Sequence, residues 1–329
     1  MRSYVVRRLV YMLITLWLLS VVSFVLIQLP PGDYVTNLVS SMKAFGADTL
    51  DESQITALRK YYGLDKSLAE QYLRWVTRFV QGEMGRSFSY EKPTIQLLQE
   101  RLPYTVLLSL STIVFIYLVA VPIGVYVATH QYGFSDYLFT ALGFIGLSTP
   151  NFMLALILMY IFFKYFGISA GGLFSREYAM APWSLAKVWD LIQHLWVPVI
   201  VLGTAGTAGI IRVMRGVLLD ELGKQYVITA RAKGVSERRL LFKYPVRVAI
   251  NPIVSTIGWN LPEIVSGGTI TAIVLSLPTL GPILFNALRV QDFYLAASIL
   301  MVLGILTVVG TLLSDILLVI VDPRIRMER

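Results

Sequence analysis

The stretch Leu9–Leu29, LVYMLITLWLLSVVSFVLIQL, carries no charged residue and decides the class of fold. About 20 apolar residues, in a helix that rises 1.5 Å per residue, cross the roughly 30 Å of hydrocarbon in a bilayer. Arginines precede the stretch, as in a secretory signal peptide. However, it is longer than the apolar region of a signal, and no small-x-small cleavage site follows it. We therefore expect residues 1–29 to form an uncleaved first transmembrane helix.

Five further stretches are long and apolar enough to cross a membrane. They lie at Thr105–Thr129, Tyr137–Phe163, Leu195–Ile211, Ala249–Leu277 and Tyr294–Val321. Of the 329 residues, 56% are hydrophobic and 15% are charged, and the mean hydropathy is +0.68. Soluble domains are about half apolar and about a quarter charged. The sequence therefore predicts an all-α polytopic membrane protein with six transmembrane helices.

Lysine and arginine are unevenly distributed among the segments that join these spans. The N-terminal tail has three, the segment 212–248 has nine, and the C-terminal tail 322–329 has three, whereas the short loops on the opposite face have few. Cytoplasmic loops of membrane proteins carry an excess of these residues. Both termini and the segment 212–248 are therefore predicted to lie in the cytoplasm.

Residues 30–102, called the insertion below, form a long polar segment between the first two spans. The insertion has nine basic and nine acidic residues. Long loops cross the membrane largely regardless of their charge, so we expect the insertion to be extracytoplasmic. Helices are predicted at Ile55–Tyr62 and Leu68–Val80. The second carries an apolar stripe of Leu68, Tyr72, Trp75, Val76 and Phe79.

Several classes of function are not expected. The chain has no cysteine, and His130 and His194 lack the spacing of metal ligands, so neither a metal site nor thiol chemistry is expected. There is no Gly-x-x-x-x-Gly-Lys-Ser/Thr loop, and we expect neither an ATP site nor any cofactor in this chain. The net charge of +8 reflects membrane topology, so nucleic acid is not an expected partner. The small residues Gly203, Gly206 and Gly209 indicate close helix packing.

The segment Asp220–Pro252 is too polar for lipid and too regular for a linker. Residues 222–243, called the knob below, contain good helix formers over Leu222–Lys233, after which Gly234 suits a left-handed helix end. Ser236 can cap a second helix, with Glu237 favoured in its first turn. Pro245 then disfavours continuation. The knob is thus predicted to be two short helices bent at a glycine.

The knob also carries a family resemblance. Tyr226-Val-Ile-Thr-Ala-Arg-Ala-Lys-Gly234 followed by Ser236-Glu-Arg-Arg239 resembles the coupling loop of binding-protein-dependent ABC importer permeases. It is most similar to the dipeptide, oligopeptide and nickel permease family, as the first of its two paired permeases. Further similar segments, in the order of the family, are Leu58–Asp65, Gln71–Trp75, Gly82–Ser87, Arg101–Pro103, Pro198–Arg215, Leu277–Gly281 and Asp322–Arg324.

The resemblance implies a type I ABC importer transmembrane domain (MetI-like). Its core would be 103–321, with the coupling loop at 212–248 and the insertion between helices 1 and 2. It also implies a bacterial or archaeal plasma membrane, the inner membrane in a Gram-negative cell. The implied partners are a second homologous permease, two ATPase subunits that bind ATP and Mg, an extracytoplasmic solute-binding protein and membrane lipid. The residues implied to couple to the ATPase are Tyr226, Ala230, Arg231, Ala232, Lys233, Gly234, Ser236, Glu237 and Arg238.

The substrate stays open between oligopeptides and oligosaccharides. Tyr244 and Val248 stand where many members of the family have His and Asn, and Ala272 stands where many have an acidic residue. Glu263 lies inside a predicted span, where a carboxylate usually faces a cavity or a partner helix. Glu263, Ser266 and Gly267 are therefore candidates for the translocation path, and a buried hydrogen bond between helices is an equally good interpretation of Glu263.

Two other interpretations compete with an importer permease. An ion-coupled secondary transporter needs mid-membrane coupling residues and usually inverted repeats, and the chain shows one such carboxylate and no repeat. A membrane enzyme lacks an evident catalytic constellation. Near the inner end of the fourth span, Arg212 and Arg215 are interpreted as interfacial anchors, with a gate or an ATPase contact as the alternative.

Overall fold

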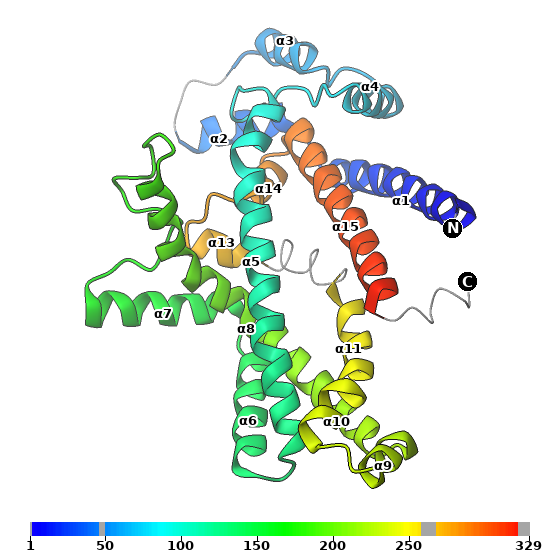
Figure 1. Cartoon of the computed structure of the whole chain (residues 1–329). Coiled ribbons are helices and arrows are strands. Elements are labelled where there is room, and N and C mark those ends of the chain that lie inside the picture. The colour runs from blue at the N-terminus through cyan, green and yellow to red at the C-terminus, as the bar shows by residue number, and fades with distance from the viewer. Residues whose placement is uncertain (1, 46–49, 258–267, 322–329) are drawn as a thin grey trace. The chain divides into compact units, whose positions relative to one another are not determined.

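The computed structural model describes residues 2–45, 50–257 and 268–321. Within these ranges the regular structure is helical, with one isolated antiparallel bridge between Arg86 and Pro93 (Figure 1). The helices are α1 (Arg2–Gln28), α2 (Tyr34–Ala44), α3 (Glu52–Tyr62), α4 (Leu68–Val80), α5 (Thr94–Thr129), α6 (Phe134–Ser148), α7 (Asn151–Phe166), α8 (Leu185–Leu222), α9 (Gln225–Ala232), α10 (Glu237–Lys243), α11 (Pro245–Ser255), α13 (Thr269–Val274), α14 (Leu280–Arg289) and α15 (Phe293–Val321).

The chain divides into two compact units. The first comprises the chain up to Thr105 together with Thr279–Val308, and the second comprises Val106–Pro278 and the chain from Val309 onward. Helices α5 and α15 each begin in the first unit and end in the second. The insertion therefore shares a unit with α1, α14 and the first half of α15.

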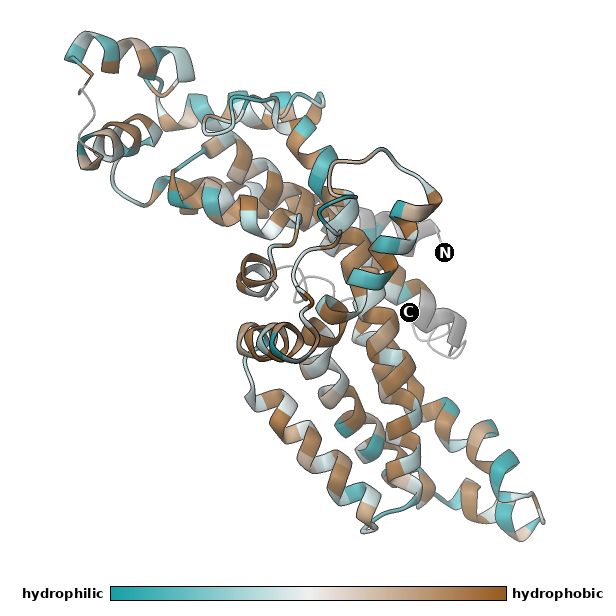
Figure 2. Cartoon of the chain, turned by 90° about the vertical axis from the view of Figure 1, so that its left-hand side faces the viewer, coloured by the Kyte–Doolittle hydropathy of each residue, from teal (hydrophilic) through white to brown (hydrophobic). Residues whose placement is uncertain are grey.

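Four described helices are long and apolar enough to cross a membrane: Val10–Gln28, Thr94–Thr129, Leu185–Leu222 and Phe293–Ile316. They overlap the first, second, fourth and sixth predicted spans, of which the second and fourth lie wholly inside their helices, and the long helices are coloured mostly as hydrophobic in Figure 2. The fifth predicted span, Ala249–Leu277, includes residues 258–267, which lie outside the described residues. The structure thus supports several transmembrane helices, and the number of six stays a prediction.

The third predicted span, Tyr137–Phe163, is not one continuous helix. It consists of α6 and α7, which meet at a bend of 104°. The break falls at Thr149, whose backbone is extended (φ −90°, ψ 117°), followed by Pro150. A proline disfavours helical backbone in the residue before it, so the helix stops at Ser148 and restarts after Pro150. Together the two helices form a fifth candidate, either a broken span or a re-entrant loop.

Helix α8 is longer than the fourth predicted span, Leu195–Ile211. It continues through residues 212–222, which the sequence places in the cytoplasmic loop. Two of its small residues pack closely on α5: a Cβ on Gly203 would lie 2.7 Å from Phe115, and one on Gly206 would lie 2.7 Å from Ile116. Close helix packing is thus confirmed at these two positions, whereas a Cβ on Gly209 would meet no atom within 4 Å.

The first unit has an aromatic core beneath the insertion. Trp75 of α4 is 1% exposed and packs with Phe24 of α1, Phe88 and Phe293 in one hydrophobic cluster. The apolar stripe of α4 therefore faces the core as predicted, except that Leu68 at its start is exposed. Helix α4 has the predicted bounds, and α3 begins three residues before the predicted Ile55 because Asp51 and Gln54 form a capping box.

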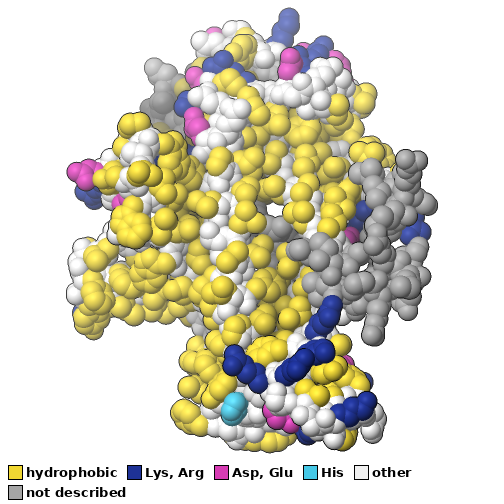
Figure 3. Space-filling view, in the orientation of Figure 1, with side chains coloured by type: hydrophobic (Ala, Val, Ile, Leu, Met, Phe, Trp, Pro, Cys, Tyr) yellow, Lys and Arg dark blue, Asp and Glu magenta, His cyan; other side chains and the backbone are white. Residues whose placement is uncertain are grey.

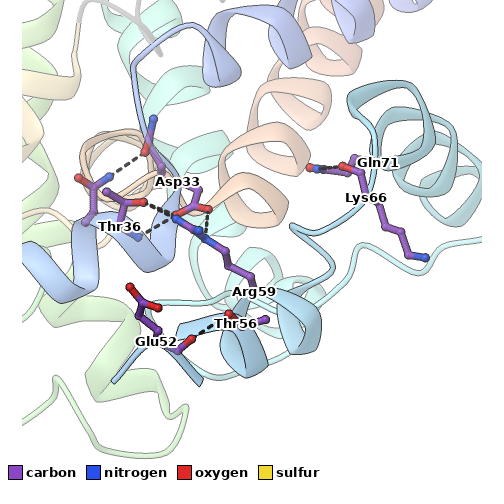
Figure 4. A network of polar contacts seen from close by, with 9 residues as sticks. Asp33, Thr36, Glu52, Thr56, Arg59, Lys66 and Gln71 are labelled. Carbon is purple, nitrogen blue, oxygen red and sulfur yellow. Dashed lines mark hydrogen bonds and ion pairs between the residues drawn. The ribbon is translucent and has the colours of Figure 1, made fainter. Parts of the chain in front are cut away.

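An ion pair joins α2 to α3 on the surface of the insertion. Asp33 caps α2 by accepting a hydrogen bond from the backbone N–H of Thr36 at 2.7 Å, and it accepts another from Nε of Arg59 at 2.9 Å (Figure 4). Partial burial opposes ionisation of Asp33, but the bonds from Thr36 and the charge of Arg59 outweigh it. The pKa of this carboxyl therefore lies below its ordinary value.

A buried carboxylate ties the insertion to the start of α15. Asp292 is 0% exposed, and its Oδ2 accepts hydrogen bonds from Oγ of Ser87 at 2.5 Å and from the N–H and Oγ of Ser89 at 2.9 and 2.8 Å. Its Oδ1 lies 3.4 Å from the N–H of Leu295, in the first turn of α15. Hydrogen bonds to a charged acceptor are stronger than neutral ones, so this contact fixes the loop 87–89 against α15.

Candidate coupling site

The first helix of the knob is α9, which is separate from α8. It begins at Gln225, three residues after the predicted start at Leu222, because α8 occupies the chain up to Leu222. Tyr226 at its start donates a hydrogen bond to Oε2 of Glu221 at 2.5 Å. Burial and this hydrogen bond raise the pKa of the Tyr226 hydroxyl, which stays protonated near neutral pH.

Gly234 ends α9 in the predicted left-handed conformation. Its φ is +75°, its N–H bonds to the carbonyl of Arg231 at 3.0 Å, and the N–H of Val235 bonds to the carbonyl of Ala230 at 3.3 Å. This pair of bonds is a Schellman motif, which satisfies carbonyls left open at the helix end. A Cβ on Gly234 would meet no atom within 4 Å, so glycine is favoured here by backbone conformation and not by space.

The second helix of the knob, α10, stops at Lys243 as Pro245 predicts. Ser236 occupies the N-cap position, but its side chain makes no capping hydrogen bond, which corrects the predicted cap. Glu237 instead turns toward α9 and accepts hydrogen bonds from Nε and Nη2 of Arg231 at 2.6 and 3.1 Å. These bonds hold the pKa of the Glu237 carboxyl below its ordinary value and link the two helices.

A small apolar core lies between α9 and α10. Val227, Ala230 and Leu240 are buried together, and Val235 and Tyr244 pack against them. Ala230 is only 8% exposed. Ala230, one of the residues implied to couple to the ATPase, therefore directs its small side chain into the knob.

The outer surface of the knob is basic with apolar side chains between the charges. Arg231, Ala232, Lys233, Ser236 and Arg238 are exposed, as are Tyr226, Ile228 and Phe242. Lysine and arginine side chains gather around α9 and α10 in Figure 3. Phe242 is 57% exposed. The sequence alone did not single out Ile228 or Phe242. Their exposure depends on which face of α9 and of α10 is buried in the knob core, and the sequence of such short helices does not show this.

The knob is joined to a further helix at each end, α8 before it and α11 after it. Helix α11 begins at Pro245 directly after Tyr244, with proline in the first turn where its missing N–H costs nothing. Ala249 and Ile253 of α11 pack with Met214 and Leu218 of α8 in one hydrophobic cluster. The connections are very short, since two residues separate α8 from α9 and one residue separates α10 from α11.

Arg215 is fixed by a partner that sequence reasoning missed. Its Nε and Nη2 each donate to Asp136 of α6 at 2.7 Å, and Asp136 also accepts from the N–H of Tyr132 at 3.0 Å. The Asp136 side chain is buried, so this bidentate pair joins α6 to α8. Asp136 directly precedes the predicted third span, which is why it was not considered an intramembrane carboxylate. Arg212, by contrast, is exposed.

The candidate path residues Glu263, Ser266 and Gly267 lie outside the described residues. Nearby, Ala272 in α13 is buried. The loop after α13 approaches the segment before α8: the N–H of Gly172 donates to the carbonyl of Leu275 at 2.6 Å. Within the described residues, no group of three or more acidic or histidine side chains could hold a metal ion.

Two family models match the chain. One, described as a binding-protein-dependent transport system inner membrane component, matches residues 120–327. The chain belongs to this family. A model of the N-terminal part of such membrane components matches residues 1–111. The protein is thus a multi-pass permease of a binding-protein-dependent ABC importer, as its sequence motifs predict.

Relatives match this permease over almost its whole length. An oligopeptide transport system permease protein of Bacillus subtilis is 34% identical over 327 residues, which cover 99% of each chain. A dipeptide transport system permease protein of Lactococcus lactis is 29% identical, over 99% of this permease and 100% of that protein. A nickel import system permease protein of Staphylococcus aureus is 25% identical, over 98% and 92% respectively.

Proposed function

We propose that this permease forms, with a second homologous permease, the path along which a solute-binding protein delivers peptides, and that two separate ATPase subunits drive the transport. The observation that carries the proposal is the knob, in a chain that belongs to the family of importer permeases. It presents basic and apolar side chains on two short helices, and it is joined directly to α8 and α11.

The knob is the part of this chain that we assign to the ATPase. Tyr226, Ile228 and Phe242 supply apolar surface between exposed cations, a combination typical of protein interfaces. The ion pair between Arg231 and Glu237 links α9 and α10 at the surface of the knob, and Leu240 packs between the two helices in the knob core. Closure of the two ATPases on ATP would then displace the knob as one body, together with α8 and α11, and switch the paired permeases between outward-facing and inward-facing states.

Peptides are the proposed substrate class because two of the relatives are named for oligopeptide and dipeptide transport. A metal ion is the second candidate, since another relative is named for nickel import. The departures at Tyr244, Val248 and Ala272 prompted the alternative of an oligosaccharide. Tyr244 packs against the knob core, however, so the identity of this residue is explained by the knob and does not favour a sugar.

The proposed orientation places both termini and the knob in the cytoplasm and the insertion outside. The chain lacks cysteine, so single cysteines at exposed Ser236 and Ser53 can report the side directly. An impermeant thiol reagent added to intact cells should label the cysteine at position 53 and leave the one at 236 unlabelled until the membrane is opened. Labelling of both in intact cells would contradict this orientation.

Uptake in proteoliposomes tests the function. The permease, its paired permease and the ATPases would be reconstituted with the solute-binding protein outside, and radiolabelled peptide, oligosaccharide and nickel would be supplied in turn. We expect peptide uptake that requires both internal ATP and the binding protein. Uptake driven by an ion gradient without ATP would favour the ion-coupled secondary transporter instead. ATP-dependent uptake of sugar or nickel alone would keep the importer and replace the substrate.

A further inference from the structure

The first unit contains an open cleft in its polar part. Its volume is about 480 Å³, and it lies between the end of α3, the middle of α4, the loop 85–91 and Tyr294 at the start of α15. Pockets that hold small ligands or a few inserted side chains have volumes of about 300–1,000 Å³. The cleft is therefore large enough to receive part of a partner.

Positive charge is concentrated in this cleft. The insertion has nine basic and nine acidic residues, yet the cleft is lined by Lys60, Arg74, Arg78 and Arg86 against a single acidic residue, Glu91. Like charges brought together repel one another, so this arrangement does not help the insertion to fold. It would be stabilised by a negatively charged partner.

The cations of the cleft differ in what they do for the fold. Arg86 donates to the backbone carbonyl of Glu91 and thereby shapes the loop, and Arg74 lies 3.5 Å from Glu70. Lys60 and Arg78 make no ion pair or side-chain hydrogen bond with the parts of the chain that the structure describes. These two side chains are free to bind a ligand.

The floor of the cleft is firmly built. Gly85 has a φ of +74°, and a Cβ there would lie 2.6 Å from the ring of Tyr294, so the loop backbone rests directly on that ring. Phe88 is buried and its ring centre lies 4.6 Å from that of Tyr62. The neighbouring Ser87 and Ser89 are fixed by the hydrogen bonds that they donate to Oδ2 of Asp292. A preformed site loses little entropy when it binds a partner.

We propose that this cleft is a docking site for an acidic surface segment of the solute-binding protein. The inference rests on the proposed function, since it names the place where that partner binds. Several cations spread over α3, α4 and a loop match several carboxylates held on one protein surface, and they exceed what the single terminal carboxylate of a peptide can neutralise. Exposed charges also give fast, salt-sensitive and reversible association, which repeated delivery requires.

Affinity measurements with the complete importer in nanodiscs test the proposal. The double variant Lys60→Glu/Arg78→Glu should bind the solute-binding protein at least about tenfold more weakly at low ionic strength, and the difference should shrink toward 1 M salt. Lys43→Glu is the matched control, because Lys43 is an exposed cation of the same insertion that does not line the cleft. It should change the affinity less than twofold. Equal affinities of the wild type and the double variant would overturn the proposal.

A second measurement does not depend on charge reversal. In this cysteine-free chain, Tyr61→Cys at the mouth of the cleft can carry a photocrosslinker, which should capture the binding protein. Failure of capture by a complex that binds normally would overturn the docking site. A free acidic peptide should not distinguish the wild type from the double variant when no binding protein is present. If the peptide binds the wild type and not the double variant, the cleft is a substrate site and the docking proposal is overturned. If the wild-type complex binds no solute-binding protein and takes up solute when only an ion gradient is supplied, the proposed function itself is refuted.

Discussion

The knob and the insertion are the two main polar regions of the chain, and they are stabilised in different ways. The knob buries Val227, Ala230 and Leu240, and its shape otherwise depends on a glycine turn and one exposed ion pair. The insertion packs aromatic side chains such as Trp75 onto α1 and α15 and is fixed by a buried carboxylate. A region with so few buried side chains has little stability of its own, so the knob must take its rigidity from α8 and α11.

This difference predicts where single substitutions act. A change inside the knob should alter coupling while the rest of the permease stays folded, because the second unit has a separate core between α5, α8 and α11. A change at the buried contacts of the insertion should reduce the stability of the whole first unit. The variants below are ordered from the largest expected effect to the smallest.

Ala230→Glu should have the largest effect. It would force a carboxylate into the knob core against Leu240, at a cost on the order of 3 kcal/mol or more. We expect a membrane-inserted permease that no longer retains its ATPase and shows no uptake. Arg238→Ala, which removes one exposed charge from the same surface, should reduce uptake much less than Ala230→Glu, because a single exposed charge contributes little. Co-purification of the ATPase and peptide uptake check both, and full uptake by Ala230→Glu would show that the knob does not transmit the motion.

Asp292→Ala should rank second. It removes the acceptor of bonds from Ser87 and Ser89 and leaves the buried hydroxyl of Ser87 without that partner, which should destabilise the first unit by about 3 kcal/mol. The control is Asp51→Ala, which removes an exposed cap of α3 at a cost of about 1 kcal/mol. Thermal unfolding of the purified permease measures both. If the two variants melt together, Asp292 does not anchor the insertion.

Gly234→Val should have an intermediate effect. A residue with a Cβ pays about 1–2 kcal/mol at positive φ, and β-branched residues are the least suited to it. We expect weaker retention of the ATPase and slower uptake, whereas Gly234→Asn should be close to the wild type because asparagine adopts this conformation more readily. Uptake rates of the two variants at equal membrane amounts test the contrast. Equal loss in both would point to contact with a partner and not to backbone strain.

Asp33→Asn should have the smallest effect, and it should depend on pH. The folded-state pKa of Asp33 lies below its ordinary value of 3.8, so its ion pair with Arg59 stabilises the insertion fully above that pH. The stabilisation is lost as pH falls through the folded-state pKa. The difference in melting temperature between the wild type and the variant should therefore be constant from pH 7 to about pH 5 and shrink below about pH 4. A difference that grows on acidification would contradict this.

The sequence was informative where the physical cause is local. The apolar stripe of α4 and the glycine that ends α9 follow from spacing and backbone preference, and both are confirmed. Hydropathy located the long helices but not their ends: it cannot show that α8 continues to Leu222 with polar residues, since that extension is stabilised by packing on α11. Hydropathy also did not reveal the bend of 104° between α6 and α7, because an apolar stretch looks the same whether its helix is straight or broken.

Contacts between distant residues could not be predicted. Asp136 and Arg215 are 79 residues apart, and Ser87 and Asp292 are 205 residues apart. Each carboxylate looks like an ordinary polar residue beside a span until the fold brings its partner near. The inward orientation of Ala230 was missed for the same reason, since the core of the knob exists only once α10 has folded back on α9.

The length of helix α8 would amplify the proposed displacement of the knob. Pro198 lies inside it and cannot donate the usual hydrogen bond to the preceding turn, so bending is easiest there. From Val199 to Leu222 the helix is about 36 Å long at 1.5 Å per residue. A tilt of roughly 10° about the proline would carry its far end, and the knob attached to it, through about 6 Å. A tilt this small would preserve most of the side-chain packing near the proline. At the other end of this lever arm it would produce a displacement larger than the rise of one helical turn.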